Sequence, residues 1–300
     1  MAGFCEDRIC IVTGAGRGIG AEHAKMLAAH GARVVVNDLG GARDGSGAST
    51  RPAQQVVDEI RAAGGEAVAN TDDVSDWKGA QNLIQQALDT YGGLDVLVNN
   101  AGILRDRMLV NMSEEEWDAV IRVHLKGTFA PSRFAAAYFR EQAKAGQPRD
   151  ARIINTTSVS GIYGNPGQTN YGTAKAGIAA FTIIAARELR RYGVTVNAIA
   201  PGALTRMTED LGMGQAGPED RERMHPRWIA PICTWLASRE SSDVTGRVFE
   251  ASGRLLAVAE GWHRGPIHDP VDDPTRLGPV VRELVSRARK NAGMDGHDLD

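Results

Sequence analysis

The sequence has few cysteines, no block of like charges and no long apolar run, and each absence excludes a class of protein. Its three cysteines, Cys5, Cys10 and Cys233, have neither the spacing of a disulfide framework nor that of a metal site. We expect them to be free thiols in a reducing compartment. The net charge of -3 comes from interspersed acids and bases, without the basic stripe of a nucleic-acid-binding protein.

No segment predicts export or membrane insertion. The first residues carry acids where a signal peptide has bases, and no apolar run approaches the roughly 20 residues that cross a bilayer. The last residues are not Ser-Lys-Leu, the peroxisomal signal. We therefore expect a soluble, cytoplasmic protein that acts on a small molecule and binds neither nucleic acid nor membrane.

A glycine-rich turn between two short apolar segments predicts a dinucleotide site. Residues 8–13 and 33–38 are typical of buried parallel strands, and a helical pattern lies between them. Glycines let the backbone approach a pyrophosphate at a helix N-terminus, and an acid closing the second strand suits the ribose. The expected cofactor-binding residues of this unit are Gly14, Arg17, Gly18, Ile19, Gly20 and Asp38.

Asp38, the acid that closes the second strand, favours NAD over NADP. The carboxylate of Asp38 can accept a hydrogen bond from a free ribose 2′-hydroxyl and would repel a 2′-phosphate. Arg17 and Arg43 could pair with that phosphate and argue for NADP, but both side chains can swing into solvent. We expect NAD as the cofactor, with NADP as the less favoured alternative.

Five further apolar segments, separated by helical patterns, extend this unit to a larger sheet. The expected fold is α/β: a Rossmann-like, doubly wound, mostly parallel seven-stranded sheet in a single domain. Asp73 and Val74 follow the third strand, and either lie against the adenine or simply begin the next helix. The expected strands cover residues 8–13, 33–38, 66–70, 94–102, 152–158, 194–200 and 246–251.

A capping box marks the start of a helix in the middle of the chain. Ser113 is expected at the N-cap and Glu116 at the third helical position. The helix should run through His124 to about Phe129, and another should follow over residues 132–145.

Tyr171 and Lys175 are spaced for proton transfer. On a helix this spacing puts the phenol and the ammonium on one face. A nearby cation lowers a tyrosine pKa that starts near 10, so such a tyrosine can exchange a proton with an alcohol or ketone near neutral pH. The alternative is a surface tyrosine stacked on a lysine stem, because chance produces this spacing often.

Two segments are expected to shape the substrate side. Residues 203–225 are rich in Gly and Met and follow a strand at the crevice edge, which predicts a mobile substrate lid; an ordinary surface excursion is the alternative. Prolines recur beyond residue 253. We expect a dinucleotide-binding domain with the catalytic site over residues 1–252 and a C-terminal extension over residues 253–300.

Taken together, these motifs resemble the short-chain dehydrogenase/reductase family over about residues 7–252. The motifs are Thr13-Gly14-x-x-x-Gly18-x-Gly20, Asn99-Asn-Ala-Gly102, Ser158, Tyr171-x-x-x-Lys175 and Pro201-Gly202. The resemblance implies an NAD(P)-dependent alcohol dehydrogenase that forms a homodimer or homotetramer, with acid–base chemistry from Ser158, Tyr171 and Lys175. It also implies cofactor contacts from Tyr171, Lys175, Asn100, Ala101, Gly102, Pro201 and Gly202.

Longer matches narrow the resemblance. The segments Asn100-Ala-Gly-Ile-Leu-Arg-Asp-Arg107 and Arg122-Val-His-Leu-Lys-Gly127 look like the dehydrogenase part of the D-specific multifunctional enzymes of peroxisomal β-oxidation. That resemblance implies oxidation of 3-hydroxyacyl-CoA thioesters with NAD, and related bacterial enzymes act on steroid alcohols or sterol-derived acyl-CoAs. The rival hypotheses are an NADPH-dependent 3-oxoacyl reductase and a nucleotide-binding sensor without turnover.

Two positions depart from the family pattern. Many members carry an asparagine that completes a proton relay through water to the lysine, and here that position is His124. His124 either holds the relay water or fills the helix interior. A threonine that contacts the nicotinamide amide in many members is replaced by Arg206, flanked by Thr205 and Thr208.

Overall fold

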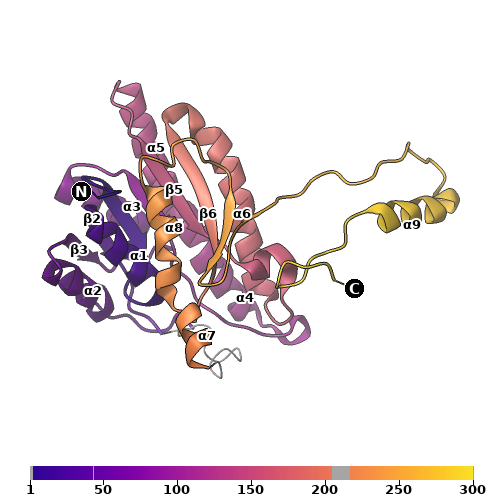
Figure 1. Ribbon diagram of the computed structural model, residues 1–300, viewed down its shortest axis with the longest axis horizontal. Coiled ribbons are helices and arrows are strands. Elements are labelled where there is room, and N and C mark those ends of the chain that lie inside the picture. The colour runs from indigo at the N-terminus through magenta and orange to yellow at the C-terminus, as the bar shows by residue number, and fades with distance from the viewer. Residues whose placement is uncertain (1–2, 43, 205–216, 300) are drawn as a thin grey trace. The chain divides into compact units, whose positions relative to one another are not determined.

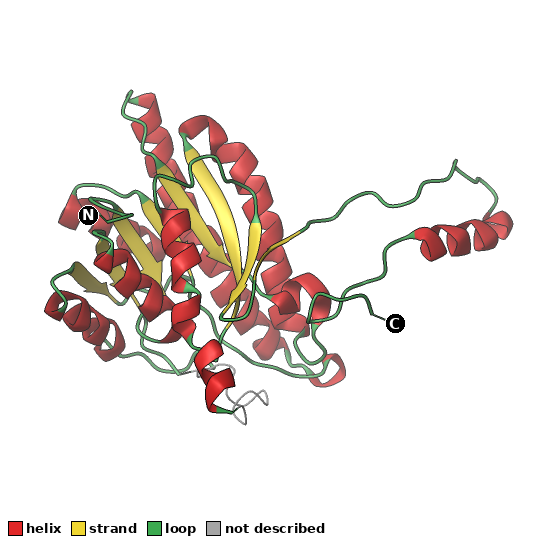
Figure 2. Cartoon of the chain, in the orientation of Figure 1, coloured by secondary structure: helices red, strands yellow, loops and turns green. Residues whose placement is uncertain are grey.

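Short apolar strands alternate with helices along the chain (Figures 1 and 2). The computed structural model describes residues 3–42, 44–204 and 217–299. The strands are β1 (Ile9–Thr13), β2 (Arg33–Asn37), β3 (Glu66–Asn70), β4 (Val96–Asn99), β5 (Ala151–Thr156), β6 (Val194–Gly202), β7 (Val248–Ser252) and β8 (Leu256–Ala259). The α-helices are α1 (Gly18–Ala29), α2 (Arg51–Ala62), α3 (Trp77–Tyr91), α4 (Glu114–Ile121), α5 (Gly127–Lys144), α6 (Thr169–Leu189), α7 (Pro218–Arg223), α8 (Ala230–Ala237) and α9 (Leu277–Arg287).

The strands form one sheet in the order β3-β2-β1-β4-β5-β6-β7-β8. Neighbours pair in parallel from β3 to β7, and β8 alone is antiparallel. The doubly wound α/β fold is therefore confirmed, with eight strands in the described residues instead of the expected seven. The sequence did not reveal β8 because its inward positions are alanines and its leucine and valine are exposed, so it lacks the apolar signal of a buried strand.

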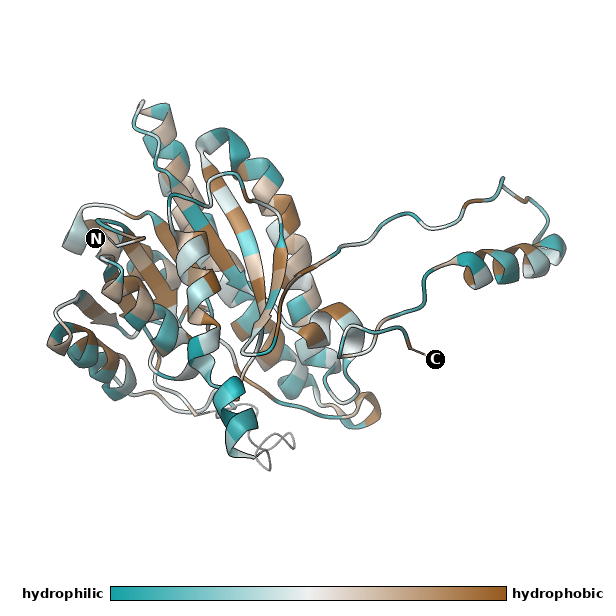
Figure 3. Ribbon diagram, in the orientation of Figure 1, coloured by the Kyte–Doolittle hydropathy of each residue, from teal (hydrophilic) through white to brown (hydrophobic). Residues whose placement is uncertain are grey.

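Alternating side chains of the first strand enter two different core clusters, one on each face of the sheet. On β1, Cys10 and Val12 pack with α1, α2 and α8, whereas Ile9 and Ile11 pack with α3, α5 and α6. Successive side chains of a strand point to opposite faces, so an unbroken apolar run can fill both layers. Figure 3 shows apolar positions concentrated on the strands and mixed polarity on the helices around them.

This topology places a crevice at one edge of the sheet. The chain runs outward from β1 to β2 and β3 on one side, and returns to β4 on the other side of β1. The loops that follow β1 and β4 therefore diverge at the carboxyl edge, where open α/β sheets bind their ligands. Gly14 follows β1 and Asn100 follows β4, so both residues lie at this switch point.

The capping box at the start of α4 is confirmed, but the next helix boundary differs from the prediction. Ser113 and Glu116 exchange side-chain and backbone hydrogen bonds as expected. A π-helical turn, Arg122–Lys126, then joins α4 to α5, so no break occurs near Phe129. Pro131 lies inside α5, where it removes one backbone hydrogen bond and its ring crowds the preceding turn, yet the helix continues through it.

The chain divides into two compact units, one ending at Ala259 and one beginning at Glu260. The sequence predicted that the extension begins at residue 253. The boundary lies after β8 instead, because β8 pairs with β7 and extends the sheet. The second unit contains α9, none of whose residues is buried. Most of the expected lid, including Thr205, Arg206 and Thr208, lies outside the described residues, as does Arg43.

The central strands should be far more sensitive to truncation than the edge strand. Leu97 of β4 is 0% exposed and Leu256 of β8 is 65% exposed. Leu97→Ala should lower the free energy of unfolding by about 2–5 kcal/mol because it leaves a cavity. Leu256→Ala, the same change on an exposed face, should cost under about 0.5 kcal/mol. Denaturant unfolding of both variants checks this, and equal losses would contradict the assignment of the core.

Candidate active site

The turn between β1 and α1 depends on glycine backbone geometry. Gly14 and Gly18 have φ of +61° and +54°, in the region that side chains disfavour. A Cβ on Gly14 would lie 2.7 Å from the Cα of Ala101, in the loop after β4. Arg17 is exposed at the N-cap of α1, and Ile19 packs against the core below. The turn therefore presents backbone rather than side chains to the crevice.

Asp38 ties this turn to the loop after β2. One carboxylate oxygen accepts the Gly16 N–H at 2.8 Å, and the other accepts the Gly40 N–H at 2.7 Å. Each carboxylate oxygen has a second lone-pair site, so Asp38 retains capacity for ribose hydroxyls. The chemistry of the glycine turn and this acid fits a nicotinamide dinucleotide.

Thr13 and Asn100 join the loops after β1 and β4. The Asn100 side-chain amide donates to the carbonyls of Thr13 and Gly14 at 3.0 and 3.1 Å. The Thr13 hydroxyl accepts the backbone N–H groups of Asn100 and Ala101 at 2.9 and 3.1 Å. Thr13 is thus a site residue that glycine spacing alone does not reveal.

Four other predicted cofactor positions lie between β3 and α3 or at the end of β6. Asp73 accepts the Ser75 N–H and hydroxyl at 2.8 and 2.6 Å and opens the turn into α3, as one of the two alternatives expected. Val74 is buried. Pro201 and Gly202 are the last residues of β6 and pair with Ala251 and Ser252 of β7.

Ser158, Tyr171 and Lys175 converge where β5 ends against α6. The Lys175 ammonium lies 5.6 Å from the centroid of the Tyr171 ring and donates to the Thr156 carbonyl at 2.6 Å. A side-chain hydrogen bond joins Ser158 to Tyr171, and the Ser158 hydroxyl accepts the Ser160 N–H at 3.1 Å. The structure thus brings together three residues that are dispersed in the sequence.

Burial governs the acidity of this group. Burial is the main reason that the pKa of Tyr171 is raised to about 12; the hydrogen bond with Ser158 opposes this rise, and the charge of Asp106 contributes to it. Burial also lowers the pKa of Lys175 to about 7. The predicted fall in the Tyr171 pKa is therefore wrong for the protein's own groups, because desolvation of the phenolate outweighs the nearby ammonium.

His124 lies in the π-helical turn, against the same tyrosine. Its ring meets the Tyr171 ring edge-on at a centroid distance of 5.1 Å. Its Nε2 lies 3.1 Å from the Ile103 nitrogen and 2.7 Å from the Ile103 oxygen, and a single ring nitrogen can serve only one of them at a time. Burial lowers the pKa of His124 to about 3, so the ring is neutral.

The ring of His124 is closely fitted to the cofactor-side loop. A Cβ on Gly102 would lie 2.4 Å from its Cε1, so this loop needs glycine there. The Nδ1 of His124 is buried without a partner among the described residues. His124 therefore fills the interior of the site and also leaves one polar atom unused.

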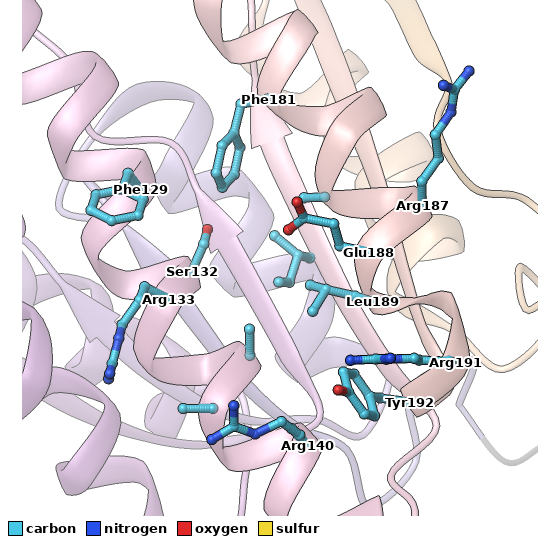
Figure 4. Close-up of a pocket in the computed structure, with 14 residues that line it drawn as sticks. Phe129, Ser132, Arg133, Arg140, Phe181, Arg187, Glu188, Leu189, Arg191 and Tyr192 are labelled. Carbon is cyan, nitrogen blue, oxygen red and sulfur yellow. The ribbon is translucent and has the colours of Figure 1, made fainter.

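A hollow lies away from Tyr171, between α5 and α6 (Figure 4). Its volume is about 660 Å³, and its aromatic walls come from Phe129 of α5 and from Phe181 and Tyr192. Figure 4 shows Arg133, Arg140 and Arg191 around it.

Cys5, Cys10 and Cys233 are free and buried, and burial raises the pKa of each thiol. Within residues 3–42, 44–204 and 217–299, no three metal-binding side chains cluster. Over the same ranges, no helix combines the length and apolar character needed to cross a membrane.

The family model for short chain dehydrogenases matches residues 8–215, which include the glycine turn, Ser158, Tyr171 and Lys175. The chain belongs to this family. It is an oxidoreductase that interconverts a secondary alcohol and a ketone, with a nicotinamide nucleotide as cofactor and a small molecule as substrate.

Known relatives agree with this assignment. The chain is 43% identical over 308 residues to the hydroxyacyl-CoA dehydrogenase ChsB1 of Mycobacterium tuberculosis, covering 97% of this chain and 93% of that protein. It is 44% identical over 279 residues to the peroxisomal multifunctional enzyme type 2 of Mus musculus, covering 93% of this chain and 34% of that enzyme. The crystal structure of a short chain dehydrogenase from Mycobacterium avium has a TM-score of 0.87 and 55% identity, covering 97% of this chain and 98% of that one.

The glycine turn provides a test with a matched control. Gly14→Ala should weaken NADH binding at least about tenfold, because the new Cβ would displace the loop at Ala101. Gly47 also has positive φ, at +74°, but a Cβ there would meet nothing within 4 Å. Gly47→Ala should therefore cost similar backbone strain and leave binding unchanged. Fluorescence titration with NADH, alongside thermal unfolding, distinguishes the two, and equal affinities would refute the role of the turn.

Proposed function

We propose that this enzyme oxidises the 3-hydroxyl group of 3-hydroxyacyl-CoA thioesters, with NAD as the oxidant. The observation that carries the proposal is the convergence of Ser158, Tyr171 and Lys175 at the sheet edge, beside the loops that fit a dinucleotide. The names of the similar enzymes, a hydroxyacyl-CoA dehydrogenase and a multifunctional enzyme, support this substrate class.

In this mechanism Tyr171 exchanges the hydroxyl proton. Its phenolate takes the proton from the alcohol during oxidation, and its phenol returns it during reduction. Ser158 hydrogen-bonds with Tyr171 and orients the substrate oxygen. A bound nicotinamide ring supplies the hydride acceptor. Hydride leaves the carbinol carbon as the O–H bond breaks, which yields the ketone.

Lys175 supports that proton transfer from a buried position. Its ammonium faces the Tyr171 ring and is held by the Thr156 carbonyl. Burial brings its pKa to about 7, so it can gain or lose a proton near neutral pH. His124, with its unused Nδ1, is proposed to hold water on the other side of Tyr171.

The cofactor would be NAD, held along the carboxyl edge of the sheet. Asp38 is rigidly placed by two backbone N–H groups, and this favours a free ribose hydroxyl over a phosphate. The proposed contacts are Gly14, Arg17, Gly18, Ile19, Gly20, Asp38, Asp73, Val74, Asn100, Ala101, Gly102, Tyr171, Lys175, Pro201 and Gly202.

The enzyme is further proposed to work as a cytoplasmic homodimer or homotetramer. The hollow between α5 and α6 supports an oligomer, because it combines an aromatic wall with exposed apolar groups such as Phe129. Aromatic and arginine side chains together are typical of protein interfaces.

A substrate panel tests the reaction. NAD reduction would be followed with 3-hydroxyacyl-CoAs of several lengths, hydroxysteroids and sterol-ring acyl-CoAs. Tyr171→Phe should lower turnover of the best substrate by at least about a thousandfold, because no group replaces the phenol. Tyr192→Phe, the same change in the turn that follows α6, should leave turnover unchanged. Near-normal turnover in Tyr171→Phe would refute the mechanism, and NADH binding without turnover on any substrate would favour a sensor.

Cofactor choice needs a separate experiment, since an NADPH-dependent 3-oxoacyl reductase is the rival activity. The ratio of kcat/KM with NAD to that with NADP should exceed one and fall about tenfold or more in Asp38→Asn, because the charge that repels a 2′-phosphate is removed. Asp58→Asn, on the exposed face of α2, is the matched control. A preference for NADP in the wild-type protein would reject the NAD assignment.

A further inference from the structure

A second π-helical turn, Ser160–Gly164, follows Ser158 and binds it through three backbone donors. The Ser158 carbonyl accepts the N–H groups of Gly161 and Ile162 at 2.9 and 3.1 Å. The Ser158 hydroxyl accepts the Ser160 N–H at 3.1 Å. Such turns are rare and are frequent at functional sites. Because its carbonyl and its hydroxyl are both bonded to this turn, Ser158 keeps its orientation only while the turn stays in place.

One side of this turn is fitted directly against α6. A Cβ on Gly161 would lie 2.5 Å from a backbone nitrogen of the helix. A Cβ on Gly172 of the helix would lie 2.9 Å from the Ser160 carbonyl oxygen. Glycine at both positions lets the two backbones lie in contact, so the turn sets where Ser158 stands relative to Tyr171.

The other side of the turn packs on the sheet through a small apolar cluster. The buried members of this cluster in the described residues are Ala198 and Ala200 of β6 and Val248 of β7, and Ile162 of the turn packs against them. Apolar stabilisation grows with the area removed from water, and alanines bury little of it. A polar contact between the turn and the sheet therefore has more weight here than it would in the two large cores.

Tyr163 of the turn makes that polar contact. Its hydroxyl donates to the Oε1 of Glu250, a residue 87 positions further along the chain. A hydrogen bond to a carboxylate is charge-assisted and stronger than one between neutral groups. Burial, and then this bond, raise the pKa of Tyr163 to about 12, so the phenol keeps the proton that it donates at neutral pH.

Glu250 is fixed in the sheet from both sides. Its position on β7 pairs with Ala200 of β6 and with Ala257 of β8. Side chains two apart on a strand share a face, so Glu250 lies on the same face as Val248, which packs toward the turn. The carboxylate is therefore attached to a strand that is paired along both edges, and it gives the turn a fixed point.

We propose that Tyr163 and Glu250 are positioning residues that act through Ser158: their hydrogen bond attaches the π-helical turn to β7 and so keeps the Ser158 hydroxyl aligned with the catalytic tyrosine. The role of this pair rests on the proposed function only through the part that Ser158 plays toward the substrate oxygen. It requires no contact of either side chain with substrate or cofactor.

Steady-state kinetics test the pair, with 3-hydroxybutyryl-CoA or the fastest substrate of the panel. Tyr163→Phe keeps the ring and removes the donor, so kcat should fall about tenfold or more while KM for NAD stays within about twofold. Glu250→Ala should lose as much. Glu250→Gln keeps an acceptor oxygen and should stay within about threefold of wild-type turnover. The matched control, Tyr192→Phe, should not change kcat.

Two kinetic results would overturn the role of the bond. One is normal turnover in Tyr163→Phe. The other is an equal loss in Glu250→Gln and Glu250→Ala, which would make the charge rather than the hydrogen bond responsible.

A double-mutant cycle separates action through Ser158 from a general loss of structure. In a Ser158→Ala background the hydroxyl that the turn positions is already absent, so adding Tyr163→Phe should lower kcat by less than about twofold. A further loss as large as in the wild-type background would show that the pair acts elsewhere and would overturn the proposal. Thermal unfolding checks that the four proteins fold, and Glu250→Ala replaces Tyr163→Phe if that variant does not.

Hydrogen exchange provides a readout that needs no substrate. The amides of Ser160, Gly161 and Ile162 are the donors that bind Ser158. Their exchange, followed by mass spectrometry on peptides of the turn, should quicken about tenfold or more in Tyr163→Phe and stay near the wild-type rate in Glu250→Gln. Faster exchange without turnover on any substrate of the panel would reject the proposed function and retain the attachment of the turn. Unchanged exchange would overturn that attachment, whatever the turnover.

Discussion

The buried side chain of Asn170 is the interaction on which the geometry of the site depends. Its amide bonds to the segment after β4 and to α4, and its oxygen bonds to the backbone of Tyr171. An unpaired amide in this position would cost the free energy of burying a polar group without compensation. The bonds of Asn170 therefore hold the three segments together in an arrangement that brings the tyrosine beside the cofactor loop.

Short polar side chains also hold together the loops on the cofactor side of the site. Asn100 and Thr13 bridge the loops after β1 and β4, and Asp38 bridges the glycine turn and the loop after β2. In each case a short polar side chain bonds to backbone groups that no strand or helix can satisfy. Loops at a sheet edge would otherwise leave such groups unpaired. These side chains therefore fix the loops after β1, β2 and β4 relative to one another.

Inside this frame, burial decides which groups of the site carry a proton. Burial raises the pKa of Tyr171 to about 12 and lowers that of Lys175 to about 7. Both shifts favour the neutral forms, because a low-dielectric site disfavours either charge. A ground state with a neutral phenol can donate a proton to a ketone, whereas oxidation of an alcohol requires further positive charge at the site. The charge of Asp106 acts on the pKa of Tyr171 in the same direction as burial.

The sequence by itself determined the local features of this protein. Glycine spacing predicted the turn between β1 and α1, short apolar runs predicted the strands, and Ser113 with Glu116 predicted the start of α4. The spacing of Tyr171 and Lys175 predicted a shared face. Each of these depends on residues close together in the chain, where backbone geometry alone sets the distances.

Only the tertiary structure decided the rest. The hydrogen bond between Gln168 and Asp106 joins residues 62 positions apart, and no sequence motif near either residue predicts it. The added strand β8 is defined by pairing with β7, since its own side chains carry little apolar signal. The sign of the Tyr171 pKa shift reversed for the same reason. Spacing places a cation beside a phenol, but how much water remains around them depends on every element packed against the site.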